Sequence, residues 1–281
     1  MMNDYQNITI DNNVKNVYAI GDLHGYENIV MLNRHIKNMN ITHSVMFLLG
    51  DNGMGFYIND YDDSSYKSFV NKELRGWKTL NQIGVNRDIT FIAFRGNHDN
   101  PKVYDKDFVT PMVKQLSNVI FVDDFAHVTI NSTGHKVICI GGGTSIDYMF
   151  RKPYTSYWFD EEVKDIPFDE WYDMCKEFQP NVILSHVTTA FHRREMGFGE
   201  LKPYFADNML IERLNKEYNT IGKYVMNIPC VDSSKVQYCF GHYHKRCDVQ
   251  NTIDNRVDHC IAMVGESEDC IFQLENINVN V

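Results

Sequence analysis

The sequence lacks the long apolar segments that membrane proteins need. None of its 281 residues fall in a run approaching about 18 uninterrupted apolar residues, the length at which a transmembrane helix becomes a candidate. The first residues, Met1-Met2-Asn3-Asp4, also lack the basic and apolar stretches of a secretory signal peptide. These absences exclude a membrane-embedded class, and we expect a soluble, cytoplasmic protein with no membrane partner.

A disulfide framework is missing as well. The chain has seven cysteines, which is an odd number, and none of them form a CxxC pair. Disulfide-rich secreted domains and cysteine-ligated structural zinc sites both use cysteines paired at short spacing. The cysteines therefore indicate reduced thiols in a reducing compartment.

Positive charge is scarce in this chain. It carries 27 Lys and Arg against 37 Asp and Glu, a formal net charge of -10. Proteins that track a nucleic-acid backbone concentrate basic side chains on one surface, so an extended nucleic-acid interface is not expected. No internal repeat or low-complexity tract is present, and 43% of the residues are hydrophobic. A chain of this length and composition can bury a sizeable core, and we expect a single domain over residues 1–281.

Five short polar motifs each follow an apolar run that is typical of a buried strand. The motifs are GDLHG at 21–25, GDNG at 50–53, GNHD at 96–99, SH at 185–186 and GHYH at 241–244, after the runs 17–20, 45–49, 89–94, 182–184 and 236–240. Loops that leave the carboxyl ends of strands in one sheet converge on a crevice. Their aspartates, asparagine and histidines are the nitrogen and oxygen ligands of first-row divalent metals. The pattern predicts a two-metal hydrolytic centre.

The rest of the chain predicts an α/β (α+β) fold in which βα units precede a more β-rich half. Apolar spacing predicts helices over 27–39, 64–83, 168–178 and 206–218, and strands over 119–122, 127–130 and 136–140. Alternating stretches at 257–264 and 270–274 predict closing antiparallel strands. Residues 187–234, between the last two motifs, suit a lid or insertion over the metals, or an ordinary surface excursion.

The ordered motifs resemble the signature of the calcineurin-like metallophosphoesterases, which is GDxH, GD, GNH(D/E), a single His and GHxH. All five parts occur in order between Asp22 and His244, and such a set is far more specific than one tetrapeptide. The resemblance implies a four-layer αββα sandwich of two mixed sheets flanked by helices, with the metal site at the edge where the strands end. It also implies a metal-dependent phosphoric ester hydrolase.

Seven side chains are the candidate metal ligands. Asp22 and His24 lie two residues apart, so an extended chain sends both side chains to one face, where they can bind one ion. The resemblance implies that Asp51 bridges two ions roughly 3.5 to 4 Å apart. The implied sets are Asp22, His24, Asp51 and His244 for the first ion, and Asp51, Asn97, His186 and His242 for the second.

The ligand types do not fix the identity of the metal. Mixed aspartate, asparagine and histidine ligation suits Mn, Fe, Zn or Ni, with Mg also open, and Mn is the working choice. Two divalent ions bring about +4, and the carboxylates of Asp22 and Asp51 bring about -2, which leaves the centre with about +2. An acidic protein can therefore hold a locally positive phosphate pocket.

Three further residues have candidate roles beside the metals. In the family, the histidine of GNH(D/E) acts on the leaving group and the acidic residue orients its ring, which implies these roles for His98 and Asp99. Related members have an arginine after a glycine-rich segment like 141–145. Arg151 is therefore a candidate phosphate contact, with a solvent-facing charge as the equal alternative. Arg95 and His192 are weaker candidates of the same kind.

The implied reaction is hydrolysis of phosphate mono- or diesters by a metal-bound hydroxide, with a nucleotide or other small phosphoester as the expected substrate. Serine/threonine protein phosphatases carry GDxxDRG as the second motif and lack GHxH, whereas residues 50–56 here read GDNGMGF without arginine. Protein dephosphorylation is thus less favoured. A nuclease-type phosphodiesterase and a catalytically inactive binding protein of the same fold stay open. The sequence does not define an oligomeric state.

Overall fold

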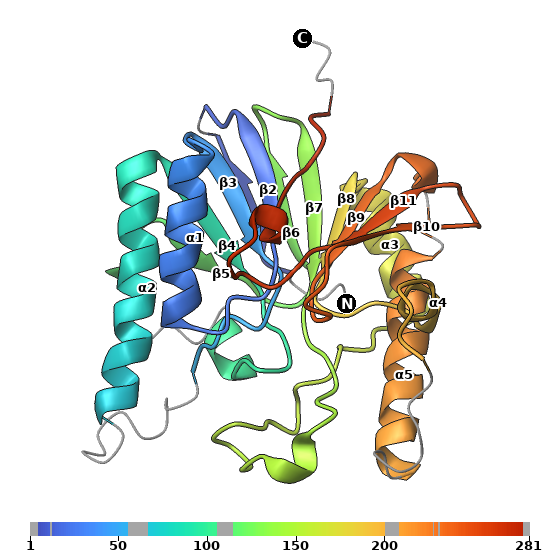
Figure 1. Cartoon of the computed structure of the whole chain (residues 1–281). Coiled ribbons are helices and arrows are strands. Elements are labelled where there is room, and N and C mark those ends of the chain that lie inside the picture. Colours follow the sequence, from blue (N-terminus) through green and yellow to red (C-terminus); the bar gives the residue numbers. More distant parts are fainter. Residues whose placement is uncertain are drawn as a thin grey trace.

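Two β-sheets lie face to face between two layers of helices (Figure 1). The computed structural model describes residues 5–11, 13–55, 67–105, 115–199, 208–226, 228–229 and 231–277. Helices α1 (Tyr26–Asn38) and α2 (Lys67–Arg87) cover one sheet, and α3 (Phe168–Phe178) and α5 (Asn208–Val225) cover the other. This arrangement confirms the predicted four-layer sandwich of α/β character.

The five-stranded sheet carries the first three motifs. Its order is β12-β2-β3-β4-β5, and all neighbours are parallel except β12, which runs antiparallel to β2 at the edge. The strands are β2 (Asn16–Ile20), β3 (Ser44–Leu48), β4 (Ile89–Ala93), β5 (Val119–Phe121) and β12 (Ile271–Gln273). All of β3 is buried, because a parallel sheet is covered on both faces, and this accounts for its uninterrupted apolar sequence.

The seven-stranded sheet carries the last two motifs and has the order β1-β6-β7-β8-β9-β11-β10. Its strands are β1 (Asn7–Ile10), β6 (Ala126–Ile130), β7 (His135–Ile140), β8 (Val182–Ser185), β9 (Gln237–Phe240), β10 (Cys247–Gln250) and β11 (Val257–Cys260). The predicted antiparallel closure is confirmed for β12 and is only partly right for β11. That strand forms an antiparallel hairpin with β10 but lies between β10 and β9, so it runs parallel to β9.

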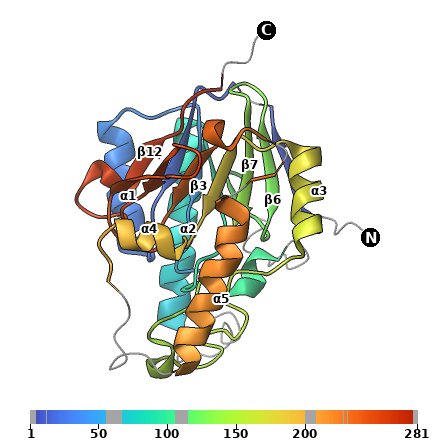
Figure 2. The same ribbon diagram turned by 90° about the vertical axis from the view of Figure 1, so that its right-hand side faces the viewer.

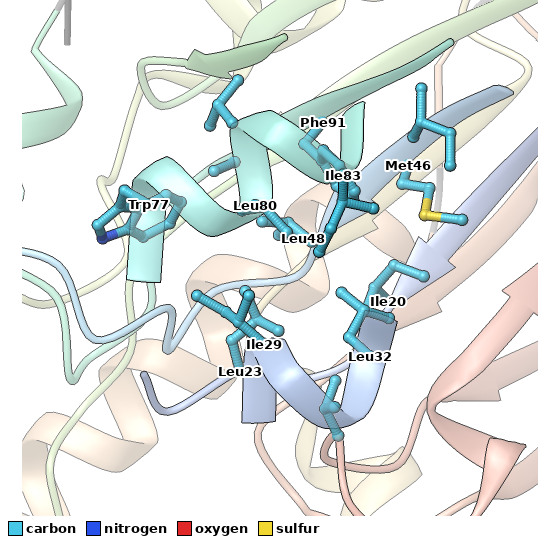
Figure 3. Close-up of a cluster of buried hydrophobic side chains, with 14 of the residues drawn as sticks. Ile20, Leu23, Ile29, Leu32, Met46, Leu48, Trp77, Leu80, Ile83 and Phe91 are labelled. Carbon is cyan, nitrogen blue, oxygen red and sulfur yellow. The ribbon is translucent and has the colours of Figure 1, made fainter. Parts of the chain in front are cut away.

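Three apolar layers hold the sandwich together. Figure 3 shows Ile29 and Leu32 of α1 and Trp77 and Leu80 of α2, which recur at helical spacing and pack onto the first sheet. A second layer, which includes Phe47, fills the space between the two sheets. A third lies between the second sheet and its helices. The outcome is a rigid platform whose strand ends carry the five motifs.

The segment expected to be a lid or insertion contains two helices. Figure 2 looks onto this side of the molecule and shows α3, the short α4 (Ala190–Glu195) and α5 in front of the seven-stranded sheet. The side chains of Ile221 and Tyr224 in α5 are buried with Trp171 of α3, so this half of α5 belongs to the core. Residues 200–207 of the segment, and 64–66 at the expected start of α2, lie outside the described residues. The lid and the single domain both stay predictions.

Among the helices in the described part of the chain, none is both long enough and apolar enough to span a bilayer.

Truncation of Phe47 tests the importance of the layer between the sheets. Its ring is fully buried, and replacing a buried phenylalanine with alanine leaves a cavity, so Phe47→Ala should lower the free energy of unfolding by about 3 to 5 kcal/mol. Urea denaturation measures the change. Val85→Ala on the exposed face of α2 is the control and should stay within about 0.5 kcal/mol of the parent. A loss under about 1 kcal/mol for Phe47→Ala would contradict the packing described above.

Candidate metal centre

The structure brings the seven candidate ligands together at the ends of five strands. Their backbone positions follow β2, β3 and β4 of one sheet and β8 and β9 of the other. Asp22, His24 and His244 form one group, and Asp51, His186 and His242 form another. Within each group, one ligand atom per residue lies within 4.8 Å of the others. A third such group joins His24 and Asp51 to His98, so the groups follow the two predicted ligand sets only in part.

Asp51 belongs to the second group and also faces the first. Its Oδ2 is 3.8 Å from Nε2 of His24, and its Oδ1 is 3.3 Å from Nε2 of His186. The two carboxylate oxygens thus face different groups, which is the placement that a bridging carboxylate needs. Burial, together with the charges of Asp22 and Asp99, raises the pKa of Asp51 well above its ordinary value. A cation beside this carboxylate would favour its charged form.

His186 and Asn97 present two acceptor atoms to each other. Nδ1 of His186 lies 2.8 Å from the carbonyl oxygen of Leu49, which can only accept, so Nδ1 carries a proton, and a ring protonated there alone has Nε2 as an acceptor. Asn97 donates through Nδ2 to Oγ of Ser145 at 3.1 Å, which turns its Oδ1 toward the site. Oδ1 of Asn97 and Nε2 of His186 are 2.9 Å apart. Two facing lone pairs at this distance require a proton or a cation between them.

Asp22 offers a second buried acceptor to the site. Its Oδ2 faces Nε2 of His244 at 3.1 Å. Burial acts to raise the pKa of Asp22, but the nearby rings of His244 and His186 hold it down to about 2. A buried carboxylate that stays charged needs a positive partner. The donor set at both groups therefore fits divalent ions, as the family implies.

Strained backbone holds several of these side chains in place. His24, Asp51, His242 and His244 have φ angles of 48°, 47°, 69° and 52°. Residues other than glycine uncommonly adopt this left-handed backbone conformation. Those that do often lie at functional sites, where surrounding contacts hold the conformation. The strain indicates that the loops are shaped for ligand placement rather than for their own stability.

The glycines of the motifs are required by close approach of the ligands. A Cβ on Gly50 would lie 2.5 Å from Nδ1 of His186, and one on Gly96 would lie 2.3 Å from Oδ1 of Asp51. Each glycine thus leaves room for a candidate ligand from a different motif. This explains why a glycine precedes both Asp51 and Asn97, which the sequence alone does not reveal.

Asp99 makes contacts other than the one implied by the resemblance. Its buried carboxylate accepts hydrogen bonds from the backbone N–H groups of Gly96, Asn52 and Met54 at 2.8, 3.1 and 3.0 Å. Within the described ranges, none of its hydrogen bonds reaches the ring of His98. The expected orienting contact is therefore missing, because this carboxylate satisfies buried backbone donors of two motif loops instead. It fixes the loop of Asp51 against the loop of Asn97.

His98 and Arg151 meet at the margin of the two groups. Nε2 of His98 is 3.8 Å from Oδ2 of Asp51 and accepts a hydrogen bond from Nη2 of Arg151. Burial, and then the charge of Arg151, lowers the pKa of His98 to about 2. Arg151 is held by Asp147, whose Oδ1 lies 2.7 Å from its Nε, and its side chain is only 8% exposed. The solvent-facing alternative for Arg151 is therefore wrong.

The two weaker phosphate candidates make internal contacts. Arg95 forms a bidentate pair with Asp124, with contacts of 3.0 and 2.7 Å. His192 is fully buried, and its Nε2 lies 2.7 Å from Oδ2 of Asp258. Both side chains thus stabilise the scaffold around the site instead of facing it.

A buried chain of contacts lies behind Asn97 and was not predicted from the sequence. Ser145 donates from its N–H and Oγ to the two carboxylate oxygens of Glu161, at 2.8 and 2.7 Å. Arg213 of α5 donates to Glu161 at 2.9 Å. The glycine run at 141–145 was the only available signal, since Glu161 and Arg213 belong to no motif. These contacts hold the Ser145 hydroxyl that orients the amide of Asn97.

Replacing Ser145 tests this orientation. Ser145→Ala removes the acceptor for Nδ2 of Asn97, so the amide can turn, and we expect the affinity for one of two Mn²⁺ ions to fall at least about tenfold. Calorimetric titration of the metal-free protein with Mn²⁺ measures both affinities. Ser117→Ala, at an exposed position, is the matched control and should leave them unchanged. Unaltered Mn²⁺ affinities in Ser145→Ala would show that the hydroxyl does not position a ligand.

Comparison with known proteins adds family membership to this geometry. The family model described as calcineurin-like phosphoesterase matches residues 15–246. No curated protein matches the chain. One crystal structure is 11% identical with a TM-score of 0.48, covering 88% of this chain and 90% of its own. The crystal structure of TT1561 of Thermus thermophilus is 11% identical with a TM-score of 0.45, covering 94% and 99%. The family model covers most of the chain, and the chain therefore belongs to the calcineurin-like phosphoesterases.

Proposed function

We propose that this protein hydrolyses phosphate mono- or diesters at a centre of two divalent metal ions, with Mn²⁺ as the working choice. The observation that supports this most is the pair of facing acceptors, Oδ1 of Asn97 and Nε2 of His186, 2.9 Å apart. The first ion would be held by Asp22, His24, Asp51 and His244, and the second by Asp51, Asn97, His186 and His242. When bound, such ions lower the pKa of water and neutralise the phosphoryl oxygens.

Arg151 would bind the substrate's phosphoryl group. Its guanidinium lies beside His98 at the margin of the ligand groups and is anchored from behind by Asp147. A guanidinium matches two phosphoryl oxygens with parallel N–H donors, and an anchored one needs little reorganisation as charge shifts in the transition state. Arg151 thus supplies positive charge from the protein itself.

His98 would supply a proton to the departing oxygen. Arg151 presently donates to Nε2 of His98 and helps to lower the pKa of that ring. When the guanidinium donates to a phosphoester instead of to His98, Nε2 becomes available, and the negative charge of the substrate raises the pKa of His98. A proton on Nε2 can then pass to the leaving group. Arg151 and the substrate together would therefore control the protonation of His98.

The expected substrate is a nucleotide or another small phosphoester. The second motif lacks the phosphate-binding arginine of protein serine/threonine phosphatases, and the net charge of -10 does not favour a long nucleic acid. A small molecule does not need an extended basic surface.

A substrate panel with a ligand variant tests the proposal. The metal-free protein, reconstituted with Mn²⁺, should hydrolyse at least one of a monoester, a diester, a 2′,3′-cyclic nucleotide, a phosphopeptide and single-stranded DNA. Asp51→Asn should lower kcat/KM at least about a hundredfold, because it weakens the bridge between the two ligand groups. Asp232→Asn, an exposed position outside the site, should behave as the parent. Inactivity on every substrate with two Mn²⁺ ions bound would instead support a binding protein of the same fold.

The proton-donor role of His98 makes a separate prediction. His98→Gln should retain two Mn²⁺ ions per chain but lower kcat by about 10² to 10⁴ for an alkyl phosphate, whose leaving group needs a proton. A nitrophenyl phosphate needs no such proton and should lose much less. Metal analysis and kinetics on both substrates give the answer. Equal losses on the two esters would exclude His98 as the acid.

A further inference from the structure

Exposed apolar side chains gather in one short segment beside the candidate centre. Of thirteen large apolar residues that are exposed in the described part of the chain, five fall within residues 146–159. They are Ile146, Met149, Phe150, Tyr154 and Phe159, with Phe150 reaching 88% exposure. Single exposed apolar residues are ordinary, but a local concentration marks a surface that contacts something.

The same segment reaches the reaction centre. Arg151, next to Phe150 in the chain, donates a hydrogen bond to Nε2 of His98. The turn after it is closed by hydrogen bonds from the N–H of Lys152 to Oγ of Ser156 at 3.1 Å and from the N–H of Tyr154 to the carbonyl of residue 157 at 2.7 Å. The exposed aromatic side chains therefore stand on a fixed turn next to the predicted phosphate contact.

A cavity of about 300 Å³ lies between this turn and the chain that follows His98. It is lined by Asn100, Lys102, Tyr154, Trp158, Phe159 and Asp160. Asn100 follows His98 by two residues, so their Cα atoms are at most roughly 7 Å apart. The volume is at the lower end of the range for small-molecule sites. It suits one ring system rather than a whole polymer.

The walls of the cavity combine aromatic rings with polar groups. The rings of Tyr154 and Phe159 meet edge to face, with centroids 5.4 Å apart and an interplanar angle of 67°. The two residues are 61% and 60% exposed, so both rings keep surface available for a further ring. Lys102 adds a hydrogen-bond donor and Asp160 an acceptor on the same lining.

We propose that this cavity is a base subsite, formed by Lys102, Tyr154, Trp158, Phe159 and Asp160, for the nucleobase of a nucleotide substrate. The inference rests on the proposed phosphoesterase function, because the phosphate of the same molecule would lie at the metal centre near Arg151. Aromatic side chains bind nucleobases by stacking, and any of the bases can stack in this way. The sugar would bridge the space between the two positions.

The polar lining favours a nucleobase over a simple aryl group. A nucleobase presents both donors and acceptors along its edge, which can pair with Asp160 and Lys102. The phenyl ring of a phosphotyrosine has no such edge groups and would leave both side chains unused. A long nucleic acid is disfavoured because the cavity admits one ring and the chain is strongly acidic.

Paired substrates that differ only in the base test the subsite. The Mn²⁺-reconstituted full-length protein is assayed on a nucleoside 5′-monophosphate and on ribose 5-phosphate, which has the same sugar and phosphate. We expect kcat/KM to be at least about tenfold higher for the nucleotide.

Phe159→Ala should remove about tenfold of that preference, mainly through KM, and leave the rate on ribose 5-phosphate unchanged. Tyr154→Ala should act in the same direction. Phe168→Ala, an exposed phenylalanine on α3, is the control and should alter neither rate.

The outcomes separate this inference from the proposed function. Equal kcat/KM for the two substrates, an equal loss on both in Phe159→Ala, or a preference for a phosphotyrosine peptide would overturn the base subsite while hydrolysis stands. If neither sugar phosphate is hydrolysed, calorimetry on the Mn²⁺-loaded protein decides. Tighter binding of the nucleotide than of ribose 5-phosphate, lost in Phe159→Ala, would uphold the subsite although the catalytic proposal fails. Equal binding would overturn it.

Discussion

The convergence of buried acceptor atoms is the constraint on which the rest of this structure depends. Asp51 faces one histidine from each ligand group, and Asn97 and His186 turn lone pairs toward each other across 2.9 Å. Such an arrangement is unfavourable in a protein interior unless positive charge lies between the atoms. The protein holds it because each acceptor is fixed from behind: the proton of His186 points to Leu49, and the amide of Asn97 points to Ser145.

The apolar layers of the sandwich hold these unfavourable contacts in place. Strands β2, β3 and β4 are buried on both faces, and their ends cannot move without disturbing two apolar layers. On this rigid base the loops adopt left-handed backbone at Asp51 and His242, and glycines admit ligands at distances that any Cβ would block. At Asp51 and His242 the backbone adopts a conformation that these residue types rarely prefer, and such departures are expected at functional sites.

The sequence predicted much of this because the motifs lie directly after strands. An uninterrupted apolar run such as that of β3 is typical of a strand that is buried on both faces of a parallel sheet. The end of this strand places Asp51 at the edge where the loops converge. The contacts of Asp99 and the role of Ser145 could not be predicted, since both depend on partners far along the chain: Asp99 binds backbone donors near residue 52, and Ser145 depends on Glu161 and α5. The pairing of β11 was missed for a different reason: the local hairpin with β10 decides its direction and makes it parallel to β9.

Anomalous X-ray diffraction from crystals grown with Mn²⁺ tests the central claim most directly. Two anomalous peaks are predicted on either side of the Asp51 carboxylate, one in contact with Asp22 and His244 and the other in contact with Asn97 and His186. A single peak, or peaks away from Asp51 while its side chain keeps the conformation described here, would contradict the two-metal centre.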